Sequence, residues 1–121
     1  MRTLIILVVG LLSVGCLTPE QKLRDSVLGE YDRSNEGETT FKIVLLENGV
    51  YEFHFKGNKN AEAKWSIENK EIHISFAVLF GRINVYRINQ DKSITVIANI
   101  DKDGKREEVP KEYQVTFKKI K

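Results

Sequence analysis

The hydrophobic period of the chain changes at Gly29, and this change most limits what the chain can fold into. Beyond Gly29, apolar residues recur at every second position in short runs, and clusters of Asn, Asp, Gly and Lys separate these runs. Alternation with a period of two indicates half-buried strands, and short turns between them indicate antiparallel hairpins. We expect strands over residues 30–32, 39–47, 50–56, 61–68, 71–79, 83–89, 93–101 and 112–120.

The turns between these runs have recognisable chemistry. Asn48-Gly49 predicts a two-residue type I′ turn, because both residues tolerate a positive φ. Asn69-Lys70 predicts a second two-residue turn. The longest loop opens at residues 101–105 and ends near Pro110.

A single short helix is expected before the strands. Thr18 can cap it, Pro19 suits its first position, and Gln21 completes a capping box with Thr18. Leu23 and Val27 then share one face of the helix. The fold class is therefore all-β: a small antiparallel up-and-down meander of seven or eight strands that closes into a barrel or roll, because closure removes exposed edges.

The first 16 residues have the pattern of a targeting segment. Arg2 precedes the apolar run 4–12, and the short residues 13–15 follow it. This order is typical of a secretory signal. Residues 3–19 carry no charge, a length at the lower limit for crossing a bilayer. An uncleaved membrane anchor is therefore one alternative, and an ordinary signal peptide with a chance cysteine is another.

The only cysteine lies at the end of that segment. Leu12-Ser13-Val14-Gly15-Cys16 resembles the lipobox of bacterial lipoproteins. The resemblance implies that residues 1–15 are a removed signal peptide and that Cys16 is lipidated. Residues 16–29 would then form the lipidated tether and short helix, and residues 30–121 the β domain. It also implies a location in the cell envelope, on a membrane facing the periplasm or exterior, and Leu17 favours the outer membrane in a bacterium that has one.

The start of the β domain has a second, shorter resemblance. Gly29-Glu30-Tyr31 followed by a meander is similar to the lipocalin-like (calycin) proteins, with Tyr31 where that superfamily usually has Trp. This resemblance implies a carrier of a small apolar ligand. Segments 46–51 and 64–67 also resemble small envelope lipoproteins of unassigned function, which imply no activity.

Eight aromatic residues share the expected inner face of the strands. They either pack as a core or line a small ligand cavity, and an eight-stranded barrel has an interior that side chains can just fill. These residues are Phe41, Tyr51, Phe53, Phe55, Trp65, Phe76, Tyr113 and Phe117.

A second apolar set has the opposite parity. A fully solvated outer face would not need it, so we expect either the helix or another protein chain to cover it. The set is Val44, Leu46, Val50, Ala77, Leu79, Tyr86, Ile88 and Ile97.

The sequence offers little material for catalysis or metal binding. His54 and His73 are the only histidines, and we expect two strand spacings, about 10 Å, between them, too far for one metal ion. Asp101-x-Asp103-Gly104 is only part of a calcium loop, and a plain hairpin loop is expected there. With 19 basic and 17 acidic residues, the chain lacks the basic excess of a nucleic-acid binder.

The expected function is therefore that of a membrane-anchored envelope lipoprotein with a non-catalytic binding or scaffolding role. Its expected contacts are the membrane, through acyl chains on Cys16, and a protein partner. The alternative is a lipocalin-like carrier of a small apolar ligand, and an enzyme is less expected. No cofactor, metal or nucleic acid is expected.

Overall fold

The computed structural model describes residues 18–35, 38–76 and 81–121, so Cys16 and the predicted signal segment lie outside the described residues. Its elements follow the chain from one helix into a series of strands. They are α2 (Pro19–Val27), β1 (Gly29–Asn35), β2 (Glu38–Leu45), β3 (Val50–Phe55), β4 (Asn58–Glu68), β5 (Glu71–Phe76), β6 (Arg82–Ile88), β7 (Ile94–Ile100), β8 (Arg106–Glu108), the 3₁₀ turn η1 (Lys111–Tyr113) and β9 (Thr116–Lys119).

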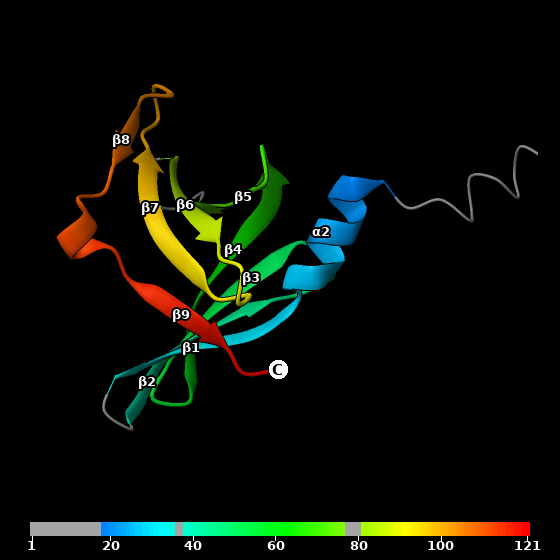
Figure 1. Cartoon of the computed structure of the whole chain (residues 1–121). Helices are drawn as coiled ribbons and strands as arrows, with labels where there is room; N and C mark the ends of the chain where they lie inside the picture. Colours follow the sequence, from blue (N-terminus) through cyan, green and yellow to red (C-terminus); the bar gives the residue numbers. More distant parts are fainter. Residues whose placement is uncertain (1–17, 36–37, 77–80) are drawn as a thin grey trace, which may run out of the picture.

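The strands form a closed antiparallel barrel. Strands β1 to β7 pair in sequence order, and β9 closes the ring by pairing with β7 on one edge and with β1 on the other. Eight strands thus make the barrel, and β8 is an additional strand on the edge of β7. Figure 1 shows α2 on one side of the barrel and β8 on the other. The predicted all-β barrel with one preceding helix is confirmed.

Two of the hairpins have two-residue turns with both residues in the left-handed region. Asn69 and Lys70 have φ values of 50° and 63°, and Lys56 and Gly57 have values of 52° and 83°. Positive φ at both positions is the requirement of a type I′ turn, whose twist matches that of the flanking strands. The prediction for Asn69-Lys70 is confirmed.

The prediction for Asn48-Gly49 is wrong in detail. The Gly49 N–H donates to the carbonyl of Leu46 over 3.1 Å, and φ is positive at Gly49 but not at Asn48. This is a three-residue loop, with a type I turn followed by one left-handed residue. The additional loop residue places Leu45 opposite Tyr51, so both side chains point into the barrel.

The last part of the chain also differs from expectation. Strand β8 lies within the expected loop, and η1 replaces the start of the expected last strand. Both β8 and β9 pair with the same edge of β7, as the partners Ala98–Glu108 and Ile94–Phe117 show. Residues 110–114 leave that edge between the two strands, and Pro110 begins this excursion.

The core lies inside the barrel and includes one residue of the helix. Val27 of α2 is only 2% exposed, and the hydroxyl of Tyr31 donates to its carbonyl over 2.6 Å. Side chains from strands on opposite sides of the barrel fill its interior. The buried cluster is Val27, Tyr31, Ile43, Leu45, Tyr51, Ala63, Trp65, Ile72, Ile74, Tyr86, Ile94 and Phe117.

The predicted faces of β6 are wrong. Tyr86 was expected outside, but it lies opposite Ile72, is 4% exposed and belongs to the core, and Ile88 packs against that core. Val85 instead lies on the opposite face of the strand, opposite His73, where it is also fully buried. Of the remaining outer set, Val44, Leu46, Val50 and Ile97 are half-buried, and Ala77 and Leu79 lie outside the described residues.

Gly29 joins the helix to the barrel at a crowded point. Its φ is 135°, and the N–H of Glu30 donates to the carbonyl of Lys121 over 3.2 Å. A Cβ atom on Gly29 would overlap that carbonyl oxygen, whereas a Cβ on Gly57 would meet no atom within 4 Å. Glycine at residue 29 therefore permits both the backbone conformation and the approach of the C-terminal strand.

Gly29→Ala should destabilise the protein by at least about 3 kcal/mol, because backbone strain and a backbone overlap add together. Gly57→Ala, the control, should lower the free energy of unfolding by only about 1 kcal/mol, because residue 57 has a positive φ. Urea unfolding of the two variants measures the difference. Equal unfolding midpoints would show that the C-terminal strand does not close the barrel at Gly29.

Candidate functional site

The structure places most of the predicted aromatic set on the inner face of the barrel. Tyr51, Trp65 and Phe117 are 3%, 4% and 7% exposed. The half-buried members are Phe41, Phe53 and Phe76, which pack against the core, and Phe55, whose ring centroid is 5.1 Å from that of Phe41. Tyr113 is the exception, because it lies in η1 and is 71% exposed, so its predicted inward position is wrong.

Large side chains fill the centre of the barrel. Tyr31, Ile43 and Ile74 have no exposed surface, and the rings of Tyr51 and Phe76 meet edge to face with centroids 5.5 Å apart. Burial raises the pKa of Tyr31 to about 12. This packing is that of a core, and the open space at described residues lies elsewhere.

A groove of about 760 Å³ lies where α2 meets the rim of the barrel. Three apolar side chains, Pro19, Leu23 and Ile67, form part of its lining, and polar side chains of the helix start and of the β4–β5 turn complete it. The residues lining this rim groove are Thr18, Pro19, Glu20, Leu23, Ile67, Asn69 and Lys70.

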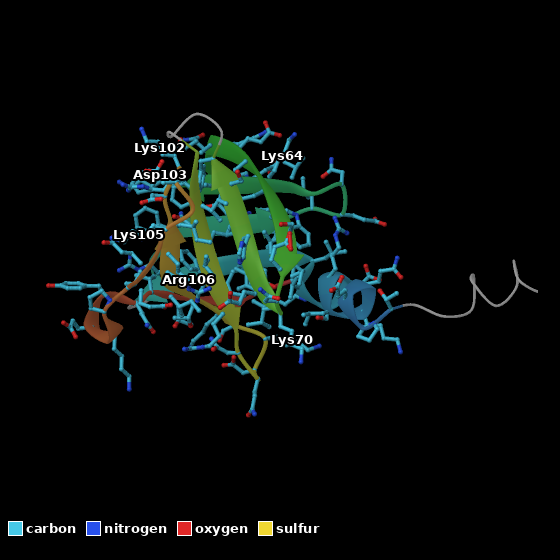
Figure 2. All side chains as sticks on the ribbon, turned by 90° about the horizontal axis from the view of Figure 1, so that it is seen from above. Lys64, Lys70, Lys102, Asp103, Lys105 and Arg106 are labelled. Carbon is cyan, nitrogen blue, oxygen red and sulfur yellow. The ribbon has the colours of Figure 1, made fainter. Side chains whose placement is uncertain are left out.

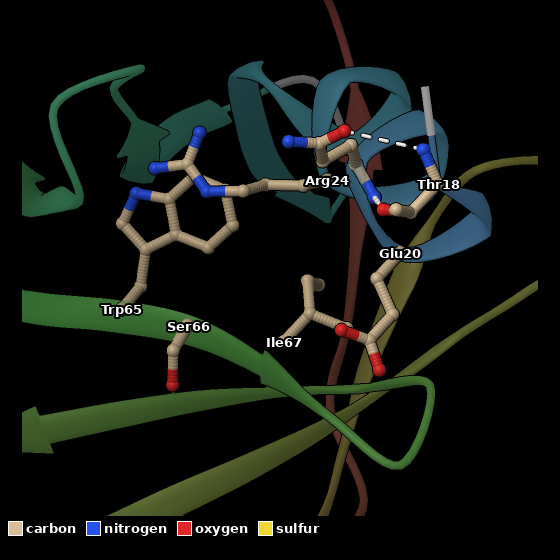
Figure 3. Close-up of a pocket in the computed structure, with 7 residues that line it drawn as sticks. Thr18, Glu20, Arg24, Trp65, Ser66 and Ile67 are labelled. Carbon is tan, nitrogen blue, oxygen red and sulfur yellow. Dashed lines mark hydrogen bonds between the residues drawn. The ribbon is translucent and has the colours of Figure 1, made fainter. Parts of the chain in front are cut away.

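A second pocket of about 380 Å³ adjoins the rim groove and shares Thr18, Glu20 and Ile67 with it. Figure 3 shows this pocket with Arg24 extended over the ring of Trp65. The guanidinium carbon lies 4.7 Å from the centre of that ring, a cation–π contact. The two hollows together run along the side of α2 that faces the barrel.

Hydrogen bonds fix the helix that forms one wall of the groove. The Gln21 N–H donates to the Thr18 hydroxyl over 3.2 Å, and the Thr18 N–H donates to the Gln21 side chain over 3.1 Å, which is the predicted capping box (Figure 3). Arg24 donates to the carbonyl of Glu47 over 2.7 Å. At the other end, the Lys119 ammonium donates to the carbonyl of Ser26 over 2.8 Å, and burial lowers its pKa.

The two histidines lie on β3 and β5 with β4 between them, as expected. The Nε2 atom of His54 lies 3.0 Å from a carboxylate oxygen of Glu52, and this hydrogen bond lowers the pKa of Glu52. The Nε2 atom of His73 is buried, has no hydrogen-bond partner among the described residues and is 3.7 Å from a carboxylate oxygen of Glu71. The described residues contain no group of three metal-ligating side chains.

Arg106 binds the carboxylate of Glu71, which lies beside His73. Its guanidinium makes two hydrogen bonds with Glu71, of 2.9 Å and 3.0 Å, and a third with Glu108 of 2.7 Å. Because β6 and β7 separate β5 from β8, this pair spans the outer face of two strands. The Arg106 hydrogen bonds lower the pKa of Glu71 and hold its carboxylate charged. The cluster ties the additional strand to the barrel.

The loop at Asp101 is a hairpin loop held by the Asp101 side chain. One carboxylate oxygen of Asp101 accepts from the N–H groups of Asp103 and Lys105, each over 2.9 Å. Gly104 supplies the left-handed residue with a φ of 83°. In Figure 2 the basic residues Lys102, Lys105 and Arg106 lie together with Asp103 on the β7–β8 side, so the charge there is mixed.

The comparisons with known proteins leave the site to be judged from its geometry. No protein-family model matches the chain, and searches of the curated proteins and of the solved structures found no match. Among the helices of the described residues, none is long and apolar enough to cross a membrane.

The rim groove was not predicted from the sequence. Leu23 was assigned to the apolar face of the helix, but Ile67, Asn69 and Lys70 were assigned only to a strand end and a turn. These residues meet because barrel closure brings the β4–β5 turn beside α2. The apolar face that Leu23 forms with Val27 on a short and otherwise polar helix is the sequence signal that could have indicated the site.

Trp65→Ala should lower the free energy of unfolding by about 3–5 kcal/mol, because it removes a buried indole and leaves a cavity beside α2. Trp65→Phe should cost less, about 1 kcal/mol, from the lost 2.9 Å hydrogen bond between the indole N–H and the carbonyl of Leu46. Denaturant unfolding monitored by circular dichroism gives both values. An unchanged midpoint for Trp65→Ala would contradict the packing described here.

Proposed function

We propose that the protein is a cell-envelope lipoprotein, anchored through acyl chains on Cys16, with a non-catalytic binding or scaffolding role centred on the rim groove. The observation that favours this site is the contrast between a filled barrel and an apolar groove at its rim. Fully buried side chains occupy the interior, whereas the groove of about 760 Å³ has a size typical of ligand sites.

The position of the helix supports the same proposal. Its capped start at Thr18 lies two residues after Cys16, so the folded domain begins where a lipidated chain would leave the membrane. Several acyl chains hold a protein durably on a bilayer, since each buried CH₂ contributes about 0.8 kcal/mol. Leu17 after the cysteine favours the outer membrane in a bacterium with two membranes.

Cys16→Ser should abolish the attachment of fatty acid and release the protein from the membrane or leave it as an unprocessed precursor. Metabolic labelling with a fatty-acid probe, followed by fractionation of membranes, tests this. Labelling of the Cys16→Ser protein at the level of the unchanged protein would rule out acylation at this residue.

A lipocalin-like carrier is the second candidate, and one observation favours it. Phe41, Phe53 and Phe55 are only half-buried, on the inner face of β2 and β3 near the end of the barrel away from α2. The ring centroids of Phe41 and Phe53 are 5.7 Å apart. A ligand entering from that end would meet this stack.

The two candidates differ in which substitutions weaken the binding of an uncharged apolar dye such as Nile red. A chain beginning at Thr18 keeps the whole barrel and α2. There, Leu23→Glu should lower the dye affinity about tenfold, because it places a carboxylate against an apolar ligand. Lys22→Glu, on an exposed neighbouring position, is the control and should leave the affinity unchanged.

The opposite pattern would support the carrier. If Phe53→Ala weakens dye binding and Leu23→Glu does not, the ligand enters the barrel rather than the rim groove. Thermal unfolding of each variant shows whether the barrel is intact in the comparison.

A further inference from the structure

The start of α2 is held rigidly at the mouth of the rim groove. The capping box fixes Thr18, and the carbonyl of Thr18 accepts a hydrogen bond of 3.0 Å from the N–H of Lys22. Thr18 and Pro19 are themselves lining residues of the groove. Whatever is attached to the chain just before Thr18 therefore starts beside this opening.

Cys16 is separated from Thr18 by Leu17 alone. Two residues of extended chain reach at most about 7 Å. An acyl chain on the Cys16 sulfur would thus start close to Thr18 and Pro19, which line the groove. Such a tether gives the chain a high effective concentration at the groove without any further contact.

The lining of the groove suits a hydrocarbon chain. Leu23 and Ile67 are half-buried and Pro19 is exposed, so their apolar surfaces remain partly uncovered. An acyl chain that moves from the bilayer into the groove exchanges one apolar environment for another. The groove walls, in contrast, lose contact with water, and burial of their apolar surface favours occupation.

We propose that one acyl chain of the Cys16 anchor occupies the rim groove, between Leu23 of α2 and Ile67 of β4. The inference rests on the proposed acylation of Cys16 and names the occupant of the proposed site. A partner that uses the groove would then compete with the anchor's own chain. The remaining chains of the anchor stay in the membrane.

Photocrosslinking of the full-length protein in its own membranes tests this proposal. Cells take up a fatty acid with a diazirine in the middle of its chain, the membranes are irradiated, and crosslinked peptides are identified by mass spectrometry. We expect crosslinks from the Cys16 lipid to peptides that contain Leu23 or Ile67. Crosslinks to phospholipid alone, or to peptides of the opposite end of the barrel, would overturn the proposal.

Matched variants make the result specific to the groove. Leu23→Glu should lower the groove crosslinks about tenfold relative to Lys22→Glu, because a carboxylate disfavours an apolar occupant. Leu23→Trp fills the groove without adding charge and should also lower the yield of groove crosslinks. A decrease in both Leu23 variants therefore reports loss of the groove's occupant and not only the effect of a buried charge on folding. Groove crosslinks of unchanged yield in both Leu23 variants would overturn the proposal.

The same experiment separates this inference from the proposed function. If the unchanged protein takes up no label at all, acylation itself fails and the inference fails with it. If the protein is labelled at Cys16 but the label reacts only with lipids, the protein is a lipoprotein with an unoccupied groove.

Discussion

Closure of the barrel by β9 is the interaction on which the rest of the structure depends. Among the described strands, this four-residue strand alone links β7 to β1, and without it the sheet would have two open edges. Gly29 lets the C-terminal residues approach β1, and Lys119 reaches from β9 to the end of α2. Closure therefore also positions the helix, and the rim groove exists because the helix lies against the closed barrel.

The sequence predicted the fold well because its signals are local. The period of two, the Asn69-Lys70 turn and the capping box at Thr18 each depend on neighbouring residues only. The loop at Asn48-Gly49 shows the limit of such signals. The dipeptide marks a turn correctly, but the pairing of Leu45 with Tyr51 decides how many residues the loop contains.

The faces of β6 could not be predicted for a related reason. Apolar residues occupy both parities of this strand, so its own alternation does not choose between Val85 and Tyr86. The choice depends on pairing with Ile72 of β5 and on an irregularity opposite β7, where Val85 pairs with Ala98 and Tyr86 with Val96. Ile97 is the additional residue of that bulge, and bulges have no strong sequence signature.

The excursion at residues 110–114 has a consequence for how this chain can vary. The N–H of Val109 donates to Ile97 and the N–H of Val96 to Val115, so the chain leaves the edge of β7 and rejoins it at neighbouring positions. Residues 110–114 take part in none of the strand pairings of the described residues. Insertions, deletions or a genetically encoded tag at Tyr113 should therefore be tolerated there, on the side of the barrel away from α2 (Figure 1). A tag at residues 110–114 would therefore show which side of the barrel is accessible when the protein is in place.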